Sequence, residues 1–243
     1  MAETRLQLCG PLVARIEGRR VEGLLPGRQG RLLLAYLVLS RRRPSTREEL
    51  IGAVWGGAGP GAAEAALSAL LSKLRRAVLL EGRGEVRLEL PPDAWVDVEA
   101  AAEALHRAES AVARGDWAAA WGPARVVQHV VERGFLPGER AAWAVERRVE
   151  LAGWLERALE AVALASLRLG GGELATAERA ARRLVQLAPL RESGTRLVME
   201  VHVRRGNRAE ALLAYDGLRR RLRDELGVPP SAETQALHRS LLG

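Results

Sequence analysis

A short run of polar and cationic residues offers the plainest chemistry in this sequence. Ser72, Lys73, Arg75 and Arg76 lie within residues 72–76. Ammonium and guanidinium groups pair with phosphate, and the planar fork of arginine suits two phosphate oxygens at once. At 100° per residue, Ser72, Lys73 and Arg76 share the side of a helix that is opposite its apolar stripe. We therefore interpret this run as a candidate surface for a polyanion.

The positive charge of the chain lies almost entirely in its first third. The 243 residues carry 37 Lys and Arg against 30 Asp and Glu. Residues 1–90 hold 15 of these cations and 9 of these anions, whereas residues 91–243 are close to neutral with 22 and 21. A basic module joined to a nearly neutral one is typical of a nucleic-acid binder that carries a second module. The alternative explanation is a generally arginine-rich composition.

Other chemistries lack the residues that they need. The single cysteine, Cys9, excludes an internal disulfide and a cysteine-based zinc site, and the four histidines have no ligand-like spacing. The glycine-rich stretch 56–61 follows a predicted helix rather than a strand, so it is no dinucleotide fingerprint. No Walker A loop, catalytic elbow or pair of catalytic carboxylates emerges. We expect no metal, no cofactor and no enzymatic activity.

The sequence also argues against a membrane protein. No stretch approaches the roughly 18 to 20 uncharged apolar residues of a membrane helix. Residues 1–30 carry charges throughout and have no apolar signal core. We therefore expect no membrane contact and a cytoplasmic location.

Strands and two helices are expected ahead of the basic run. Apolar and polar residues alternate imperfectly over residues 5–25, and glycines and a proline interrupt the pattern. This predicts short antiparallel strands. The apolar run 32–39 predicts a buried helix over 28–41. Ser45 or Thr46 then caps a second helix, which ends at Gly56.

The basic run itself falls on a third predicted helix, over residues 62–80. Leu67, Leu71, Leu74 and Val78 form its apolar stripe. The turn at residues 82–84 and the alternating residues 86–90 follow as a hairpin. Strands, three helices and then a basic hairpin are the order of a winged helix.

After residue 92 the chain changes to alanine-rich amphipathic helices. A glycine, then an acidic residue or Asn, then alanines at the third and fifth following positions recur at Gly115, Gly172 and Gly206. The last two glycines are 34 residues apart, which is the tetratricopeptide (TPR) period, although the first interval of 57 is irregular. In that repeat glycine ends one helix and the alanines allow the next to pack closely. We therefore predict helical hairpins.

Three further groups of residues have two interpretations each. The cations at 41–43 either interact favourably with the negative C-terminal end of the helix dipole or contact phosphate. The arginines at 219–221 and 223 form a solvated helix face or a second nucleic-acid patch. The pair Trp117 and Trp121 shares a helix face and, like most of the six tryptophans, fits core packing better than a ligand cage.

At this point the residues resemble a known family. The first half is similar to the OmpR-type winged helix of SARP-type antibiotic-pathway regulators, and the second half resembles their bacterial transcriptional activation domain. The winged-helix resemblance is carried by 32–39, 46–51, 54–56 and 67–78. That of the second half is carried by Phe135, Leu136, Pro137, Gly138, Trp143, Arg148, Arg191, Glu192, Leu197, Met199, Gly206, Asn207, Glu210, Ala211, Leu212, Tyr215, Asp224, Glu225, Leu226, Gly227, Pro229 and Ser231.

The resemblance implies a mainly α protein with two domains. Residues 1–96 would be an OmpR-like winged helix-turn-helix with small antiparallel β sheets, and residues 97–243 an all-α, TPR-like activation domain. We expect no receiver, forkhead-associated or ATPase domain within these residues. The implied function is a transcriptional activator that binds double-stranded promoter DNA and contacts RNA polymerase. Relatives bind tandem sites as pairs, so a homodimer on DNA is also an expectation.

The same resemblance, with the charge pattern, assigns the site residues. The third helix would enter the major groove and the hairpin would lie near the minor groove. The residues expected at DNA are Thr46, Arg47, Ser68, Ser72, Lys73, Arg75, Arg76, Arg83 and Arg87. The residues expected to contact polymerase are Trp55, Gly56, Gly57 and Gly59.

The predicted recognition helix departs from the family pattern. Polar or aromatic readers are usual in its first half, where this chain has Ala65, Ser68, Ala69 and Leu70. Only Arg, Lys, Asn or Gln makes a bidentate pair with a base. We therefore expect phosphate contacts to dominate affinity, with steep salt dependence and little specificity. The alternative is a helical-repeat interaction scaffold whose winged helix no longer reads DNA sequence.

Overall fold

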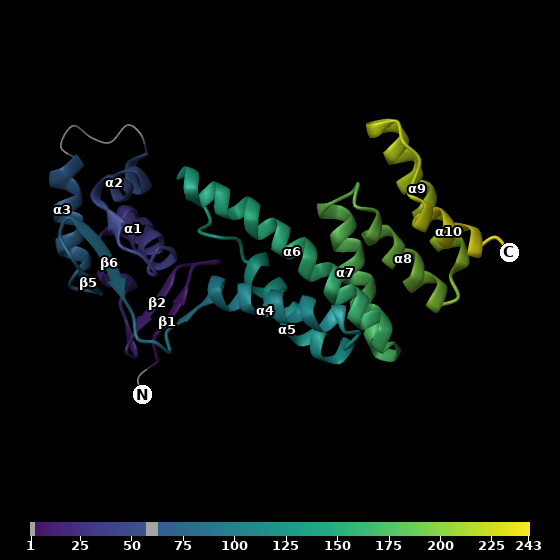
Figure 1. Cartoon of the computed structure of the whole chain (residues 1–243), viewed down its shortest axis with the longest axis horizontal. Coiled ribbons are helices and arrows are strands. Elements are labelled where there is room, and N and C mark those ends of the chain that lie inside the picture. The colour runs from purple at the N-terminus through teal and green to yellow at the C-terminus, as the bar shows by residue number, and fades with distance from the viewer. Residues whose placement is uncertain (1–2, 57–62) are drawn as a thin grey trace. The chain divides into compact units, whose positions relative to one another are not determined.

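The computed structural model describes residues 3–56 and 63–243 (Figure 1). These residues form two compact units. The first contains the chain up to Ala100 together with Val130–Leu151, and the second contains Ala101–His129 and Ala152–Gly243.

A four-stranded sheet opens the first unit. Its strands stand in the order β3-β2-β1-β7, and β1 pairs antiparallel with β2, as the alternation in residues 5–25 predicts. The sequence does not predict β7, which pairs parallel to β1 from a position some 90 residues away. The bounds are β1 Arg5–Gln7, β2 Val13–Ile16, β3 Arg19–Arg20 and β7 Trp95–Val96, and the short 3₁₀ helix η1 covers Glu22–Leu24.

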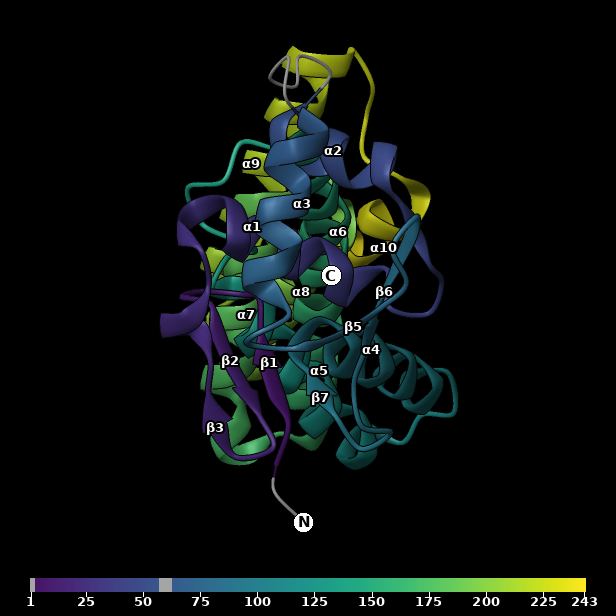
Figure 2. The same cartoon turned by 90° about the vertical axis from the view of Figure 1, so that its left-hand side faces the viewer.

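Three helices follow, and their leucines form a buried core. Leu33, Leu50, Leu67 and Leu71 from these helices are at most 1% exposed. The apolar run therefore forms a buried helix, and the leucine stripe faces inward, as predicted. Figure 2 turns α3 towards the viewer, with α1 and α2 beside and behind it. The bounds are α1 Gly27–Leu39, α2 Arg47–Trp55 and α3 Ala63–Leu74.

A three-stranded sheet completes the winged helix. Strands β5 (Leu79–Glu81) and β6 (Glu85–Glu89) form the predicted antiparallel hairpin, and β4 (Ser45–Thr46) joins β6 on its other side. Gly82 has φ +81°, and a Cβ there would lie 1.9 Å from the carbonyl oxygen of Glu85. The hairpin turn therefore requires glycine at this position.

The prediction for the end of the third helix is wrong. The helix ends at Leu74 rather than at residue 80, and Arg75 and Arg76 lie in the turn beyond it. The amide of Arg76 donates to Lys73 O at 3.2 Å, an i to i+3 bond that tightens the last turn. The chain then enters β5, because pairing with β6 extends the backbone from Leu79 onward. Val78 is buried, but not as part of a helical stripe.

Residues near 97 and 135 pack into the first unit. Asp97 begins α4 (Asp97–Ala113), and its carboxylate accepts from the amides of Leu8 and Cys9 at 2.9 Å each. Burial raises the pKa of Asp97, although these hydrogen bonds and the Arg133 guanidinium oppose the shift. Cys9 also forms a β-bridge with Phe135.

The second unit consists of helices joined by short connections, as predicted. Gly115 and Gly206 have φ +71° and +76° and follow helices, which matches the role predicted for them. At the middle repeat Gly170, with φ +72°, directly follows the preceding helix instead of Gly172. The remaining helices are α5 Trp117–Glu132, α6 Ala142–Leu169, η2 Gly171–Glu173, α7 Leu174–Leu187, α8 Glu192–Arg204, α9 Arg208–Leu226 and α10 Ala232–Ser240; parts of α5 and α6 belong to the first unit.

Tryptophan packing in the second unit agrees with the core interpretation. Trp117 and Trp121 pack against a cluster of Ala111, Ala120 and Ala165. The indole Nε1–H of Trp121 donates to Ser166 Oγ at 3.0 Å, so its polar atom has a partner. The alanines let the helices approach closely enough for these rings to cover the contact.

The arginines near the end of α9 form the solvated face that was one of the two interpretations. Arg219 and Arg220 pair with Asp216 at 2.7 and 3.1 Å, and Arg223 pairs with Asp224 at 2.8 Å. Because each cation has a nearby carboxylate, the face carries little unbalanced charge.

Candidate nucleic-acid interface

The outward face of α3 is made of small and polar side chains. Ser68, Ser72 and Lys73 are exposed there, together with Ala65 and Ala69. The opposite face holds the buried leucines of the core. Since the exposed side chains are mostly short, this face allows a flat or grooved partner to approach the helix backbone.

Three of the predicted DNA-contacting cations are free of internal partners. Lys73, Arg76 and Arg83 are exposed. Their side chains form no hydrogen bond or ion pair with any residue in the described ranges 3–56 and 63–243. Lys73 stands in the last turn of α3, Arg76 in the turn after it, and Arg83 at the tip of the hairpin. The structure therefore brings these three charges to the end of α3 and to the β5–β6 hairpin, the wing of the winged helix, without neutralising them.

Two other predicted cations are held by the hairpin. The Arg75 guanidinium donates to the carbonyl of Gly82 at 2.6 Å, which ties the end of α3 to the hairpin turn. Arg87 pairs with Glu89 and, at 3.3 Å, with Glu81. The hydrogen bond to Glu89 raises the pKa of Arg87 further above its ordinary value. These two cations are less available to a phosphate than Lys73 or Arg76.

Arg47 has the most internal partners of the nine predicted residues. Its Nε donates to Glu64 Oε2 at 2.6 Å, and its Nη2 donates to the Glu64 carbonyl at 3.1 Å and to Ser68 Oγ at 2.8 Å. Its Nη1 reaches the carbonyl of Arg83 at 3.4 Å. Arg47 thus joins the start of α2, the first turns of α3 and the wing. Glu64 is not among the nine predicted residues, and the one sequence signal for it is its place in the first turn of that helix.

Thr46 serves as the N-cap of α2. Its hydroxyl accepts from the amide of Glu49 at 3.2 Å, and the Glu49 carboxylate accepts from the amide of Thr46 at 2.8 Å. This reciprocal pair is a capping box. Arg43 pairs with Glu49 at 2.9 Å and lowers its pKa, and Arg41 pairs with Glu99 at 2.6 Å. Two of the three cations at 41–43 therefore have carboxylate partners.

Two of the four residues predicted to contact polymerase, Trp55 and Gly56, lie at the end of α2. Trp55 is half-buried, and Gly56 is exposed with φ +71° at the helix C-cap. Gly57 and Gly59 lie outside the described residues. The predicted end of this helix at Gly56 is confirmed.

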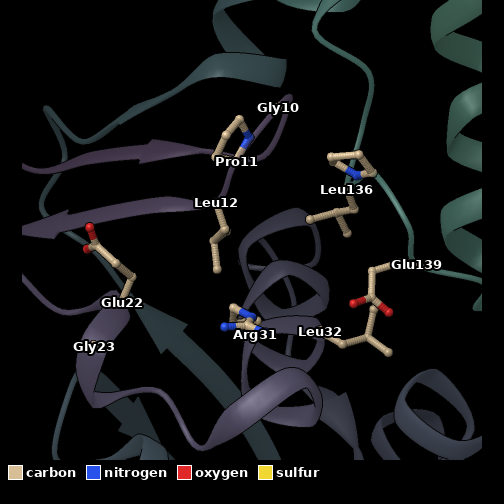
Figure 3. A pocket seen from close by; sticks show the side chains of 10 residues that line it. Gly10, Pro11, Leu12, Glu22, Gly23, Arg31, Leu32, Leu136 and Glu139 are labelled. Atoms are coloured by element: carbon tan, nitrogen blue, oxygen red, sulfur yellow. The ribbon is translucent and has the colours of Figure 1, made fainter.

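A separate cavity of about 420 Å³ lies in the first unit (Figure 3). In that view Leu12 and Leu136 point into it, and Glu22 and Glu139 lie on either side of Arg31. Its charge is mixed, because Arg31 lines it together with two carboxylates. None of the nine residues predicted to contact DNA lines this cavity.

No group of three or more His, Cys, Asp or Glu within the described ranges could hold a metal ion. In the same part of the chain, no helix is long and apolar enough to cross a bilayer.

Comparisons of the sequence find regulatory proteins. The model of the bacterial transcriptional activator domain family matches residues 96–242. The regulatory protein AfsR of Streptomyces coelicolor is 33% identical over 242 residues, which cover 98% of this chain and 24% of AfsR. AfsR of Streptomyces griseus is 32% identical over 218 residues, which cover 88% of this chain and 22% of that protein. The chain spans less than a quarter of the length of these relatives.

Among solved structures, EmbR of Mycobacterium tuberculosis, in complex with a low-affinity phosphopeptide, has the same fold. Its TM-score is 0.80 at 24% identity, and the match covers 99% of this chain and 64% of EmbR. The predicted fold, a winged helix-turn-helix with small sheets followed by TPR-like helical hairpins, is confirmed.

Proposed function

Because the chain belongs to the SARP-type regulators with a bacterial transcriptional activator domain, we propose that it activates transcription by binding promoter DNA through α3 and the β5–β6 hairpin. The family match gives the class of protein, a transcriptional regulator. The DNA-contacting residues and the partners of this chain are the further parts of the proposal.

The free cations of α3 and the wing support the DNA-binding part of the proposal. In helix-turn-helix proteins the recognition helix lies in the major groove, and flanking cations contact the phosphates. Lys73 and Arg76 mark the C-terminal end of α3, and Arg83 marks the tip of the hairpin. We assign phosphate contacts to these three, and a weaker role to Arg75 and Arg87, whose guanidinium groups already have internal partners.

The rest of the proposal concerns the whole chain. Residues 1–96 would bind DNA and residues 97–243 would serve activation, in the cytoplasm. The end of α2 at Trp55 and Gly56, with Gly57 and Gly59, would contact RNA polymerase. Two copies would bind tandem promoter sites. Short side chains on α3 leave most of the affinity to phosphates, so the preference among sequences is expected to be shallow.

A matched pair of variants tests the DNA-binding surface. The Lys73→Ala/Arg76→Ala variant removes two exposed cations without an internal partner in the described chain, and the control Arg204→Ala/Arg208→Ala removes two such cations from the second unit. Affinity for genomic DNA fragments is measured by fluorescence anisotropy at several salt concentrations. We expect the first variant to bind more weakly. The slope of the logarithm of the binding constant against the logarithm of the salt concentration is expected to become less steep by about 2, as for two lost phosphate contacts.

The control is expected to bind like the parent chain. Equal affinity and slope for the Lys73/Arg76 variant and the parent would contradict the proposed surface. Absence of salt-dependent DNA binding by the parent would instead favour the interaction scaffold.

A further inference from the structure

We propose that Glu64 reads a cytosine in the major groove and that Arg47 positions its carboxylate for this contact. The inference rests on the proposed DNA-binding function and adds a base-reading residue to it. Neither residue type nor charge alone suggests this role, since a carboxylate repels phosphate. The position of Glu64 on α3 and its contacts with Arg47 support the role.

Glu64 occupies the part of α3 that would meet base edges. It lies in the first turn of the helix, and its side chain is 65% exposed. The N-terminal residues of a recognition helix are those that contact bases. Exposed neighbours on this helix are short, Ala65, Ser68 and Ala69, so none of them reaches as far as a glutamate.

The hydrogen-bonding capacity of this face is nearly used up elsewhere. Ser68 Oγ donates to the Glu64 carbonyl at 2.8 Å and accepts from Arg47, so its single O–H is taken and one acceptor lone pair is left. Ser72 and Lys73 stand two turns further along α3. In the first half of the helix, among the described residues, the charged acceptor is the Glu64 carboxylate, whose Oε1 has no hydrogen-bond partner in that range.

Arg47 compensates the charge of Glu64 and fixes its position, which a carboxylate beside a polyanion requires. Its Nε bond to Oε2 opposes the negative charge, and its Nη2 bond to the Glu64 backbone fixes the turn that carries the side chain. A carboxylate has about four lone-pair positions, so one bond to Arg47 leaves room for others. Arg47 is thus a positioning residue rather than the DNA contact that the sequence predicts.

Cytosine is the base that fits a fixed carboxylate. In the major groove its N4 amino group is a donor, which Glu and Asp accept from. Guanine presents only acceptors there, thymine presents an acceptor and a methyl group, and adenine places its N7 acceptor beside the N6 donor. The carboxylate is therefore attracted by cytosine and repelled by an acceptor of each purine.

A selection from a randomised DNA library tests the inference on the full chain. The parent is expected to prefer cytosine at one position within an otherwise shallow motif, by about tenfold. Glu64→Gln is expected to move that preference to adenine, because an amide pairs with N6 and N7. Glu64→Ala should abolish it, and Arg47→Ala should weaken it at the same position while leaving the rest of the motif unchanged.

Base preference separates this role from a merely structural one. If Glu64 only anchors Arg47, the Gln and Ala variants keep the parent motif, and that result overturns the inference. A parent motif without a cytosine position also overturns it while leaving the proposed function intact. If the parent binds no DNA at all, the proposed function itself fails. Thermal melting of each variant verifies that an altered motif comes from a folded chain.

Discussion

At the scale of single residues, Arg148 shapes the loop that precedes α6. Its guanidinium donates to the carbonyls of Phe135 at 2.9 Å, Leu136 at 2.8 Å and Glu139. Leu136 has φ +39°, a conformation that residues with a Cβ rarely adopt. The Arg148 side chain therefore satisfies three backbone acceptors and stabilises the strained backbone of Leu136.

Replacement of Arg148 tests this role. Arg148→Ala leaves the three carbonyls without their charged donor, so we expect the free energy of unfolding of the first unit to fall by about 3 kcal/mol. Urea denaturation followed by tryptophan fluorescence measures the change. Arg140→Ala is the control, because Arg140 is exposed and has no side-chain partner in the described ranges. A loss no larger than that of the control would contradict the assignment.

Residue types predicted the chemistry of the surface, but not which cations are free. The sequence places Arg47 and Lys73 in one basic group, yet Arg47 is held by Glu64 and Lys73 is not. The two partners of that ion pair lie 17 residues apart and meet only when α2 packs beside α3. The same applies to Arg75, whose acceptor is a backbone carbonyl in a turn.

At the scale of elements, the capping box of α2 tests a local prediction. Thr46→Ala removes the hydroxyl that accepts from the Glu49 amide, and we expect a stability loss of about 1 kcal/mol. Chemical denaturation provides the measurement, with Ser72→Ala on an exposed position of α3 as the control. A change equal to the control would mean that the cap is unimportant for this helix.

Local patterns predicted most elements, and pairings between distant segments were missed. The Thr46 cap, the leucine stripe and the hairpin glycine each act within a few residues, so they are visible in the sequence. Strand β7 and strand β4 have two residues each, which is too short for an alternating pattern. Their existence depends on partners in β1 and β6. The end of α3 was likewise set by strand pairing rather than by apolar periodicity.

At the scale of the whole molecule, the first unit draws on residues beyond the winged helix. Trp143 donates from Nε1 to the carbonyl of Ala53 at 3.0 Å, and its ring meets those of Tyr36 and Phe135 edge to face. The sequence predicts a change of character after residue 92, because helix composition changes there. It shows no signal that Val130–Leu151 packs with the preceding hundred residues.

A truncation tests this dependence. A fragment of residues 1–96 lacks Asp97, Phe135 and Trp143, so the amides of Leu8 and Cys9 lose their buried acceptor. We expect the fragment to show no cooperative thermal transition by circular dichroism, whereas the full chain melts cooperatively. A cooperative transition of the fragment within a few degrees of that of the full chain would contradict the expected dependence.

Site-directed cross-linking identifies the surface of the chain that contacts DNA. Cys9 is fully buried, and burial raises its pKa to about 12, so a cysteine introduced on the surface is the reactive thiol. A photo-cross-linker is attached to Ser72→Cys on α3 or to Arg204→Cys in the second unit, and each protein is irradiated with genomic DNA fragments. We expect covalent adducts from position 72 and few from position 204. Adducts from 204 but not from 72 would contradict this expectation.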